Sequence, residues 1–138
     1  MSSFNVAQIL PSLVSGGVER GTIEVSNYLS ELNINNNIIS NGGPLAAELN
    51  KNYTKHFQLS VHSKNFFNYP LIANELKKII KINNINLVHL RSRGPAWILS
   101  FVKNINFKTI STFHNVYNDN SYFKKIYKKQ LSKVDQIV

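Results

Sequence analysis

Residues 4–10, FNVAQIL, followed by residues 11–17, PSLVSGG, decide the fold. The first segment is short and mostly apolar, which predicts a buried strand, and the second is a loop with paired glycines. Over residues 18–32 a helical pattern follows, with Val18, Val25, Leu29 and Leu32 on one face, which we expect to be the buried one. Strand, glycine loop and helix in this order predict the opening unit of a parallel α/β sheet.

The rest of the chain repeats this alternation. Further strands are expected at residues 38–40, 57–61, 87–90, 107–113 and 135–138. Further helices are expected at residues 44–50, 69–82, 96–102 and 121–133. The helix at 69–82 has the clearest apolar stripe, made by Ile72, Leu76, Ile79 and Ile80. The alternation predicts a parallel sheet with helices on both faces, joined by right-handed crossovers.

Length and composition describe an ordinary globular domain. The chain has 138 residues, of which 43% are apolar and 17% charged, and this length favours one domain. Cysteine is absent, which excludes disulfide scaffolds, thiolate metal sites and cysteine nucleophiles. No apolar run approaches the roughly 20 residues of a membrane span, and the first residues do not resemble a secretory signal. We therefore expect a cytoplasmic protein.

The formal net charge is +9, from 16 basic and 7 acidic residues. This excess favours a polyanionic partner such as nucleic acid, anionic lipid or a phosphorylated substrate. Frequent Asn, Ile and Lys are equally compatible with A/T-rich codons. Lysines outnumber arginines by 13 to 3, which argues against the reading of bases, because that role favours bidentate arginine.

The expected helix at residues 121–133 is basic and amphipathic. It carries Lys124, Lys125, Lys128 and Lys129 beside an apolar and aromatic face. This pattern is typical of a helix on an anionic membrane surface, and equally of a solvated helix that packs its apolar stripe on a sheet.

Residues that bind a ligand or take part in catalysis are expected just after the strands, because parallel α/β sheets bind ligands at the carboxyl ends of their strands. Gly16 and Gly17 follow the first strand and allow close backbone approach at a helix start, where free N–H groups bind anions. The alternative is a purely structural tight turn that positions the following helix for packing. Val18 stands where the dinucleotide fingerprint needs glycine, and no Gly-Lys-Ser/Thr of a P-loop follows.

Two arginines follow the strand expected at 87–90. Arg91 and Arg93 beside a helix start would make a phosphate or carboxylate clamp, unless they simply face water with His89 in the core. Arg20 is spaced to pair with Glu24 on one helix.

His114 follows a later strand, where an imidazole can bond a substrate hydroxyl, although a lone histidine is usually structural. No spacing suits protein metal ligands, so no metal site is expected.

Together these segments resemble the N-terminal domain of group 4 glycosyltransferases of GT-B fold. The resemblance rests on three landmarks in order: residues 10–21 (LPSLVSGGVERG), residues 87–97 (LVHLRSRGPAW) and residues 112–115 (TFHN). The likeness is greatest to bacterial lipopolysaccharide core mannosyltransferases and covers essentially the whole chain. It implies a Rossmann-like doubly wound sheet that forms the acceptor-side half of a two-domain enzyme. It also implies that residues 1–138 are a truncated N-terminal domain, with the donor-binding C-terminal domain absent.

The resemblance also assigns roles. Gly16 and Gly17 would approach the donor diphosphate, and His114 would contact the transferred sugar. Arg20, Arg91 and Arg93 would contact a phosphorylated or acidic acceptor. The implied donor is a sugar nucleotide such as GDP-mannose, and the implied acceptor is a lipid-linked saccharide at the inner membrane. The retaining transfer of this family is thought to need neither a protein nucleophile nor a metal.

Two alternatives remain open at this level. A nucleic-acid-binding module would use the positive charge and lose affinity steeply with salt, although the scarcity of arginine and the lack of a recognition motif make nucleic acid an unexpected partner. A non-catalytic remnant of the enzyme would lack its domain partner and expose its last strand. The isolated chain is expected to be inactive without a C-terminal domain.

Overall fold

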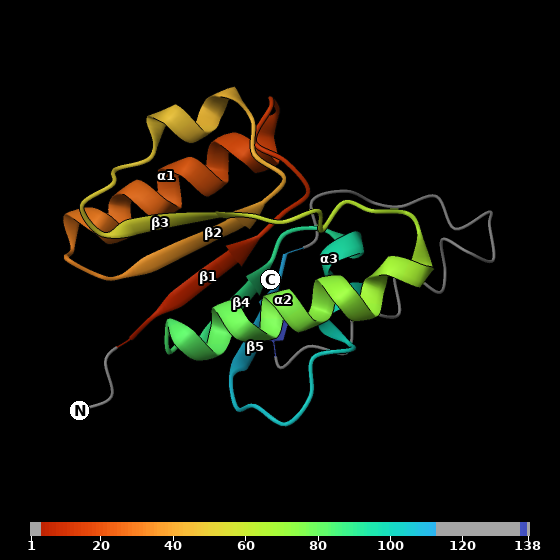
Figure 1. The fold of residues 1–138 in the computed structure, drawn as a ribbon. Helices are drawn as coiled ribbons and strands as arrows, with labels where there is room; N and C mark the ends of the chain where they lie inside the picture. The colour runs from red at the N-terminus through yellow and green to blue at the C-terminus, as the bar shows by residue number, and fades with distance from the viewer. Residues whose placement is uncertain (1–3, 113–135, 138) are drawn as a thin grey trace.

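The computed structural model describes residues 4–112 and 136–137, and within these it forms one parallel six-stranded sheet (Figure 1). The order across the sheet is β3-β2-β1-β4-β5-β6, and every neighbouring pair is parallel. The strands are β1 (Val6–Ile9), β2 (Asn36–Ser40), β3 (Thr54–Gln58), β4 (Leu87–Leu90), β5 (Lys108–Ser111) and β6 (Gln136–Ile137). This is the predicted Rossmann-like sheet, with the first strand at its centre.

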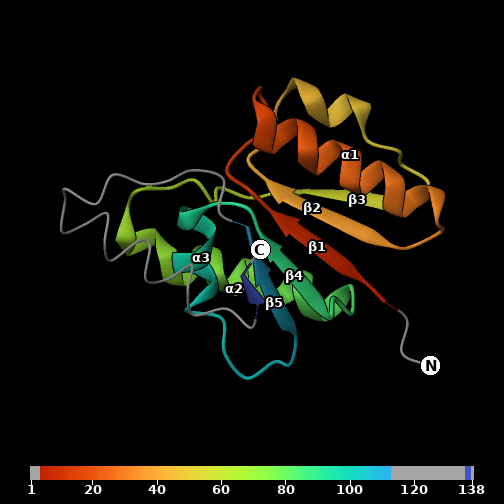
Figure 2. The ribbon, with the colours of Figure 1, turned by 180° about the vertical axis from the view of Figure 1, so that it is seen from behind.

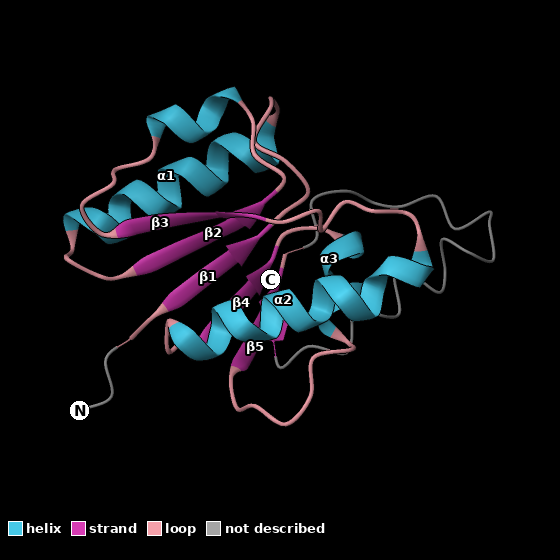
Figure 3. Cartoon of the chain, viewed as in Figure 1, coloured by secondary structure: helices cyan, strands magenta, loops and turns pink. Residues whose placement is uncertain are grey.

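Helices cover both faces of the sheet (Figures 1 and 2). The helical elements are α1 (Gly17–Glu31), η1 (Pro44–Glu48), η2 (Phe66–Asn68), α2 (Tyr69–Ile82) and α3 (Arg93–Leu99). Helix α1 and the short 3-10 helix η1 lie on one face, while α2 and α3 pack together on the other (Figure 3). The doubly wound arrangement expected from the sequence is therefore confirmed.

The face under α2 and α3 has an apolar core. Leu76 and Ile80 of α2 are fully or almost fully buried against Ile9, Val88 and other strand residues, as the predicted stripe requires. Ile72 and Ile79 complete the stripe at its partly buried edge. The helix has the predicted bounds, and it is followed by Asn84 at φ 52°, a left-handed conformation that asparagine tolerates at helix ends.

The face under α1 is mixed, which corrects the expected apolar face of this helix: Ile23 packs in an apolar cluster with Leu10 and Ile38, and polar side chains occupy the rest. The buried residues of α1 are Thr22, Ile23, Ser26 and Ser30, whereas Val25 is 39% and Leu32 is 50% exposed. The serines are buried because Asn36 and Thr54 of the adjoining strands bond them. Ser26 Oγ donates to Asn36 Oδ1 at 2.5 Å, and Ser30 Oγ lies 2.8 Å from Thr54 Oγ1. Hydrogen bonds thus attach much of α1 to the sheet.

Most element boundaries differ by one or more residues from the sequence-based expectation, and three of the differences are informative. Strand β3 spans Thr54–Gln58 rather than 57–61, because Thr54 pairs with Asn36 in the sheet register. The expected helix at 44–50 is the 3-10 helix Pro44–Glu48. Helix α3 begins at Arg93 rather than at residue 96, with Gly94 and Pro95 in its first turn, where proline loses no intrahelical hydrogen bond. The expected helix at 121–133 lies outside the described residues.

Candidate functional site

Strands β1 and β4 lie side by side at the centre of the sheet, but the chain leaves them in opposite directions (Figure 1). After β1 it runs to α1 on one face, and after β4 it runs to α3 on the other. The carboxyl ends of the strands at such a reversal are where doubly wound sheets bind their ligands. The candidate site is therefore built by the β1–α1 and β4–α3 connections.

The glycine pair lies at the start of α1, as predicted. Gly16 is the N-cap residue with φ 123°, a conformation that favours glycine, and no side chain caps the helix start. A Cβ atom placed on Gly17 would meet nothing within 4 Å, so its backbone faces open space. A Cβ on Gly16 would meet the Glu19 carboxylate at 2.6 Å, so this side chain lies at the helix start and an anion bound there would have to displace it.

Arg91 is the residue directly after β4, and it is only 8% exposed. Its Nε donates a hydrogen bond to Gln8 Oε1 at 2.6 Å, and its Nη1 lies 3.7 Å from the position of a Cβ on Gly21, in the first turns of α1. Burial lowers the pKa of Arg91. Within residues 4–112, both salt bridges are formed by other basic residues, so the Arg91 guanidinium has no carboxylate partner there. A buried cation without a counter-ion favours an anion at the candidate site.

Gln8 positions this arginine and is a site residue that the sequence interpretation missed. It lies in the middle of β1, fully buried, and its Nε2 donates to the Thr22 carbonyl of α1 at 3.3 Å. Its oxygen therefore points to Arg91, which orients the guanidinium plane. The signal was present in the sequence, because a glutamine interrupts the otherwise apolar run of residues 6–10.

Arg20 pairs with Glu48 and not with Glu24, which corrects the expected pairing. Both of its terminal nitrogens donate to the Glu48 carboxylate, which raises the pKa of Arg20. The pair is about half exposed and ties α1 to η1. Arg20 pairs with Glu48 because the fold brings this residue, 28 positions away along the chain, to where its carboxylate contacts both terminal nitrogens of the guanidinium.

The remaining predicted residues are placed only in part. Arg93 is the first residue of α3, close in sequence to Arg91. His89 is half-buried and its Nε2 lies 2.5 Å from Thr112 Oγ1, as a structural histidine would. His114 and the four lysines Lys124, Lys125, Lys128 and Lys129 lie outside the described residues. The structure thus brings Gly16, Gly17 and Arg91 to one edge of the sheet.

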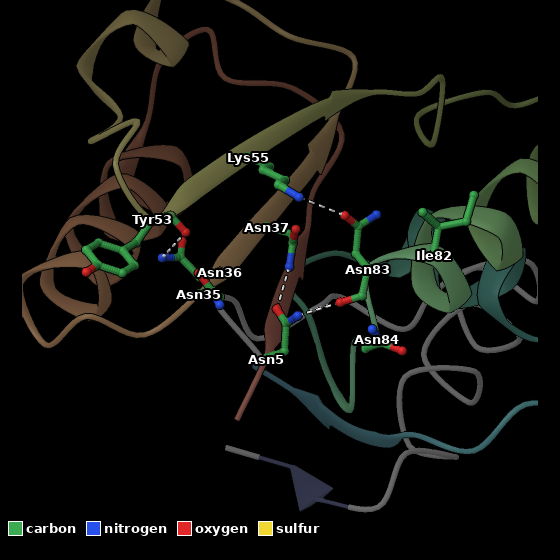
Figure 4. Close-up of a pocket in the computed structure, with 9 residues that line it drawn as sticks. All are labelled: Asn5, Asn35, Asn36, Asn37, Tyr53, Lys55, Ile82, Asn83 and Asn84. Atoms are coloured by element: carbon green, nitrogen blue, oxygen red, sulfur yellow. Dashed lines mark hydrogen bonds between the residues drawn. The ribbon is translucent and has the colours of Figure 1, made fainter. Parts of the chain in front are cut away.

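A polar cavity of about 300 Å³ lies at the opposite edge, where the strands begin (Figure 4). Its lining consists of Asn5, Asn35, Asn36, Asn37, Tyr53, Lys55, Ile82, Asn83 and Asn84. The amides largely bond one another: Asn37 Nδ2 donates to Asn5 Oδ1 at 2.8 Å, and Asn5 Nδ2 donates to the Asn83 carbonyl at 2.5 Å. The cavity is therefore a polar brace between the strand starts and the end of α2, away from the candidate site.

Residues 4–112 and 136–137 offer neither a cluster of metal ligands nor a membrane-spanning helix. No three His, Asp or Glu side chains in this part of the chain lie close enough to hold a metal ion. None of its helices has the length and apolar character needed to cross a bilayer.

The fold defines a Rossmann-like α/β domain whose candidate site lies at the switch point of its sheet. Residues 15–138 match the family described as Glycosyltransferase Family 4. The chain therefore belongs to glycosyltransferase family 4, as its three landmarks predicted.

Two solved structures have the same fold. A glycosyltransferase from Rickettsia africae ESF-5 is 45% identical over 92% of this chain, with a TM-score of 0.77. A sucrose-phosphate synthase from Thermosynechococcus elongatus has the same fold at 13% identity over 97% of this chain, with a TM-score of 0.70. This chain spans 34% and 41% of these two proteins, respectively. Among curated proteins, none matches this chain.

Proposed function

We propose that this chain is the acceptor-side domain of a retaining glycosyltransferase that acts on lipopolysaccharide core or another lipid-linked glycan. Mannose, from a donor such as GDP-mannose, is the sugar proposed. Family membership supports sugar transfer in general, and the likeness of residues 10–21 and 87–97 to core mannosyltransferases is the basis for the finer assignment.

The observation that carries the proposal is the buried Arg91 guanidinium at the switch point of the sheet, without a carboxylate partner among residues 4–112. Both substrates proposed here are anionic, since sugar nucleotides carry a diphosphate and lipid-linked core acceptors carry phosphate or acidic sugars. A fixed cation beside the start of α1 would bind such a group more tightly than an exposed one, because little water competes for it.

The residues would divide the work as follows. The backbone amides at Gly16 and Gly17 would stabilise charge on the leaving nucleotide diphosphate, once Glu19 moves aside. Arg91 and Arg93 would hold an anionic group of the acceptor, with Arg20 at the rim. His114 would bond a hydroxyl of the transferred sugar.

A second domain is part of the proposal. Because the matched glycosyltransferase is about three times as long as this chain, we propose that the donor is bound mainly by a C-terminal domain outside these 138 residues. The chain alone would then bind acceptor weakly and turn over little substrate.

Calorimetric titration tests this function directly. The chain is titrated with a lipid A–core acceptor, with GDP-mannose and with NAD, and transfer is followed with radiolabelled donor. Weak acceptor binding that falls in Arg91→Met but not in Lys78→Met supports the proposal. Robust binding of NAD in preference to both substrates would show that the candidate site serves a dinucleotide enzyme instead.

A further inference from the structure

A patch of large apolar side chains lies on the surface where α2 begins. It consists of Phe66, Phe67, Leu71 and Phe101, which are 53%, 92%, 70% and 47% exposed, and we call it the aromatic patch. Such a concentration of exposed apolar side chains is unusual on a soluble surface and marks a contact with an apolar partner.

The patch rests on rigid structure. The Phe66 ring lies 5.0 Å from the ring of the buried Tyr69 and 6.0 Å, edge-on, from the Trp97 ring of α3. The Phe101 ring lies 6.3 Å from Tyr69 on another side. These contacts hold two members of the patch against the core, so that the neighbouring Phe67 projects outward.

The patch lies at the same end of the molecule as the candidate site. Because the sheet is parallel, α2 and α3 both begin at the edge where the strands end (Figure 1). The start of α2 lies beside α3, whose first residue, Arg93, follows the Arg91 loop (Figure 2).

The part of the chain that carries the patch is mostly basic. Residues 59–112 contain eight basic residues and a single acidic one, Glu75, which pairs with Lys78 at 3.0 Å. Lys64 and Lys103 lie within two residues of Phe66 and Phe101 along the chain. Residues 4–49, by contrast, carry four glutamates and one arginine. The exposed Lys64 and Lys103 therefore give the neighbourhood of the patch a basic character that complements an anionic partner, and apolar groups flanked by lysine are suited to the interface of an anionic phospholipid bilayer.

We propose that the aromatic patch inserts into the headgroup region of an anionic phospholipid membrane, with Lys64 and Lys103 in contact with lipid phosphates. The membrane contact stands without the proposed function. Only its consequence rests on that function: the strand ends would face the bilayer surface, where a lipid-linked acceptor presents its saccharide.

Vesicle co-sedimentation of the full chain tests the proposal, with phosphatidylglycerol–phosphatidylcholine vesicles as the probe. Phe67→Ser is expected to lower the partition coefficient about tenfold, which corresponds to about 1.4 kcal/mol, because it removes a large apolar side chain that would be buried among the lipids. Tyr28→Ser is the matched control, since Tyr28 is 60% exposed on α1, in the acidic part of the chain. It is expected to leave binding unchanged.

Three outcomes would overturn the inference. Equal losses in the two variants would show no role for the patch. Loss of binding only when Lys124, Lys125, Lys128 and Lys129 are replaced would assign the contact to that segment. A large fall in melting temperature for Phe67→Ser, without a change in binding, would show that another part of the polypeptide covers the patch. Sugar transfer to a water-soluble acceptor, measured in parallel, reports on the proposed function separately.

Discussion

Replacing Arg91 by methionine separates a structural role of this residue from an anion-binding one. The substitution keeps an unbranched side chain near the backbone but removes the guanidinium, with its charge and its hydrogen bond to Gln8. If Arg91 were part of a buried ion pair, the change would cost about 3–5 kcal/mol of the free energy of unfolding. Because no carboxylate of residues 4–112 forms a salt bridge with it, we expect a different result.

Two opposing contributions set the expected stability. Loss of the bond from a charged donor, with Gln8 Oε1 left buried, costs about 2 kcal/mol. Removal of a cation that is 8% exposed relieves a desolvation penalty of similar size, about 2 kcal/mol after relaxation. The free energy of unfolding should therefore change by less than about 1 kcal/mol. Affinity for an anion at the candidate site should fall about 10- to 100-fold, as expected for the loss of a charge-assisted contact.

Urea denaturation and calorimetric titration with inorganic pyrophosphate measure the two quantities. Arg20→Met is the comparison for stability, because its pair with Glu48 is exposed to solvent and its loss should leave the free energy of unfolding nearly unchanged. A loss above about 3 kcal/mol in Arg91→Met would refute the argument for an uncompensated cation. Unchanged pyrophosphate affinity with unchanged stability would refute the anion site itself.

Four further substitutions test the fold. Gly43→Ala should lower the free energy of unfolding by about 3 kcal/mol in urea denaturation, because φ is 148° and a Cβ would overlap the Leu13 carbonyl. Gly21→Ala, with ordinary contacts inside α1, should instead gain about 0.5–1 kcal/mol, and equal effects would contradict the steric argument. Asn36→Leu should cost about 3 kcal/mol by orphaning its bonded hydroxyls, and a neutral result would show that the network adds nothing. Burial lowers the pKa of His56 below 6.5, so its protonation favours the unfolded chain. Stability should then fall as pH drops below 6.5, less steeply in His56→Gln, as urea midpoints above and below 6.5 would show.

The sequence predicted most of the fold because its local patterns agree with the tertiary structure. The apolar stripe of α2 and the run of β4 had their observed bounds, since both elements bury the residues that their patterns select. The prediction of the buried face of α1 was wrong because the fold turns two serines of this helix toward the sheet. That choice depends on Asn36 and Thr54, which approach α1 only after the strands pair. A pattern search that counts apolar residues cannot find such a face.

The site was predicted in outline, because parallel topology alone selects the strand ends. The glycine turn and Arg91 were found in this way. The long-range contacts were not predicted. Arg20 binds Glu48 rather than its helix neighbour Glu24, and Gln8 orients Arg91, which lies 83 residues away in the sequence. His114 stays a prediction. Partners that meet only through folding carry no local signal in the sequence.

The two faces of the sheet hold their helices by different proportions of apolar contact and hydrogen bonding, and temperature acts differently on these two forces. Attraction between apolar groups weakens as water is cooled, whereas hydroxyl–amide bonds do not share that dependence. Near freezing, α2 should therefore loosen from its face of the sheet before α1 does. Backbone amide exchange in the cold would then be faster in the second half of the domain, which makes low temperature a means of opening one side of the protein while the other stays closed.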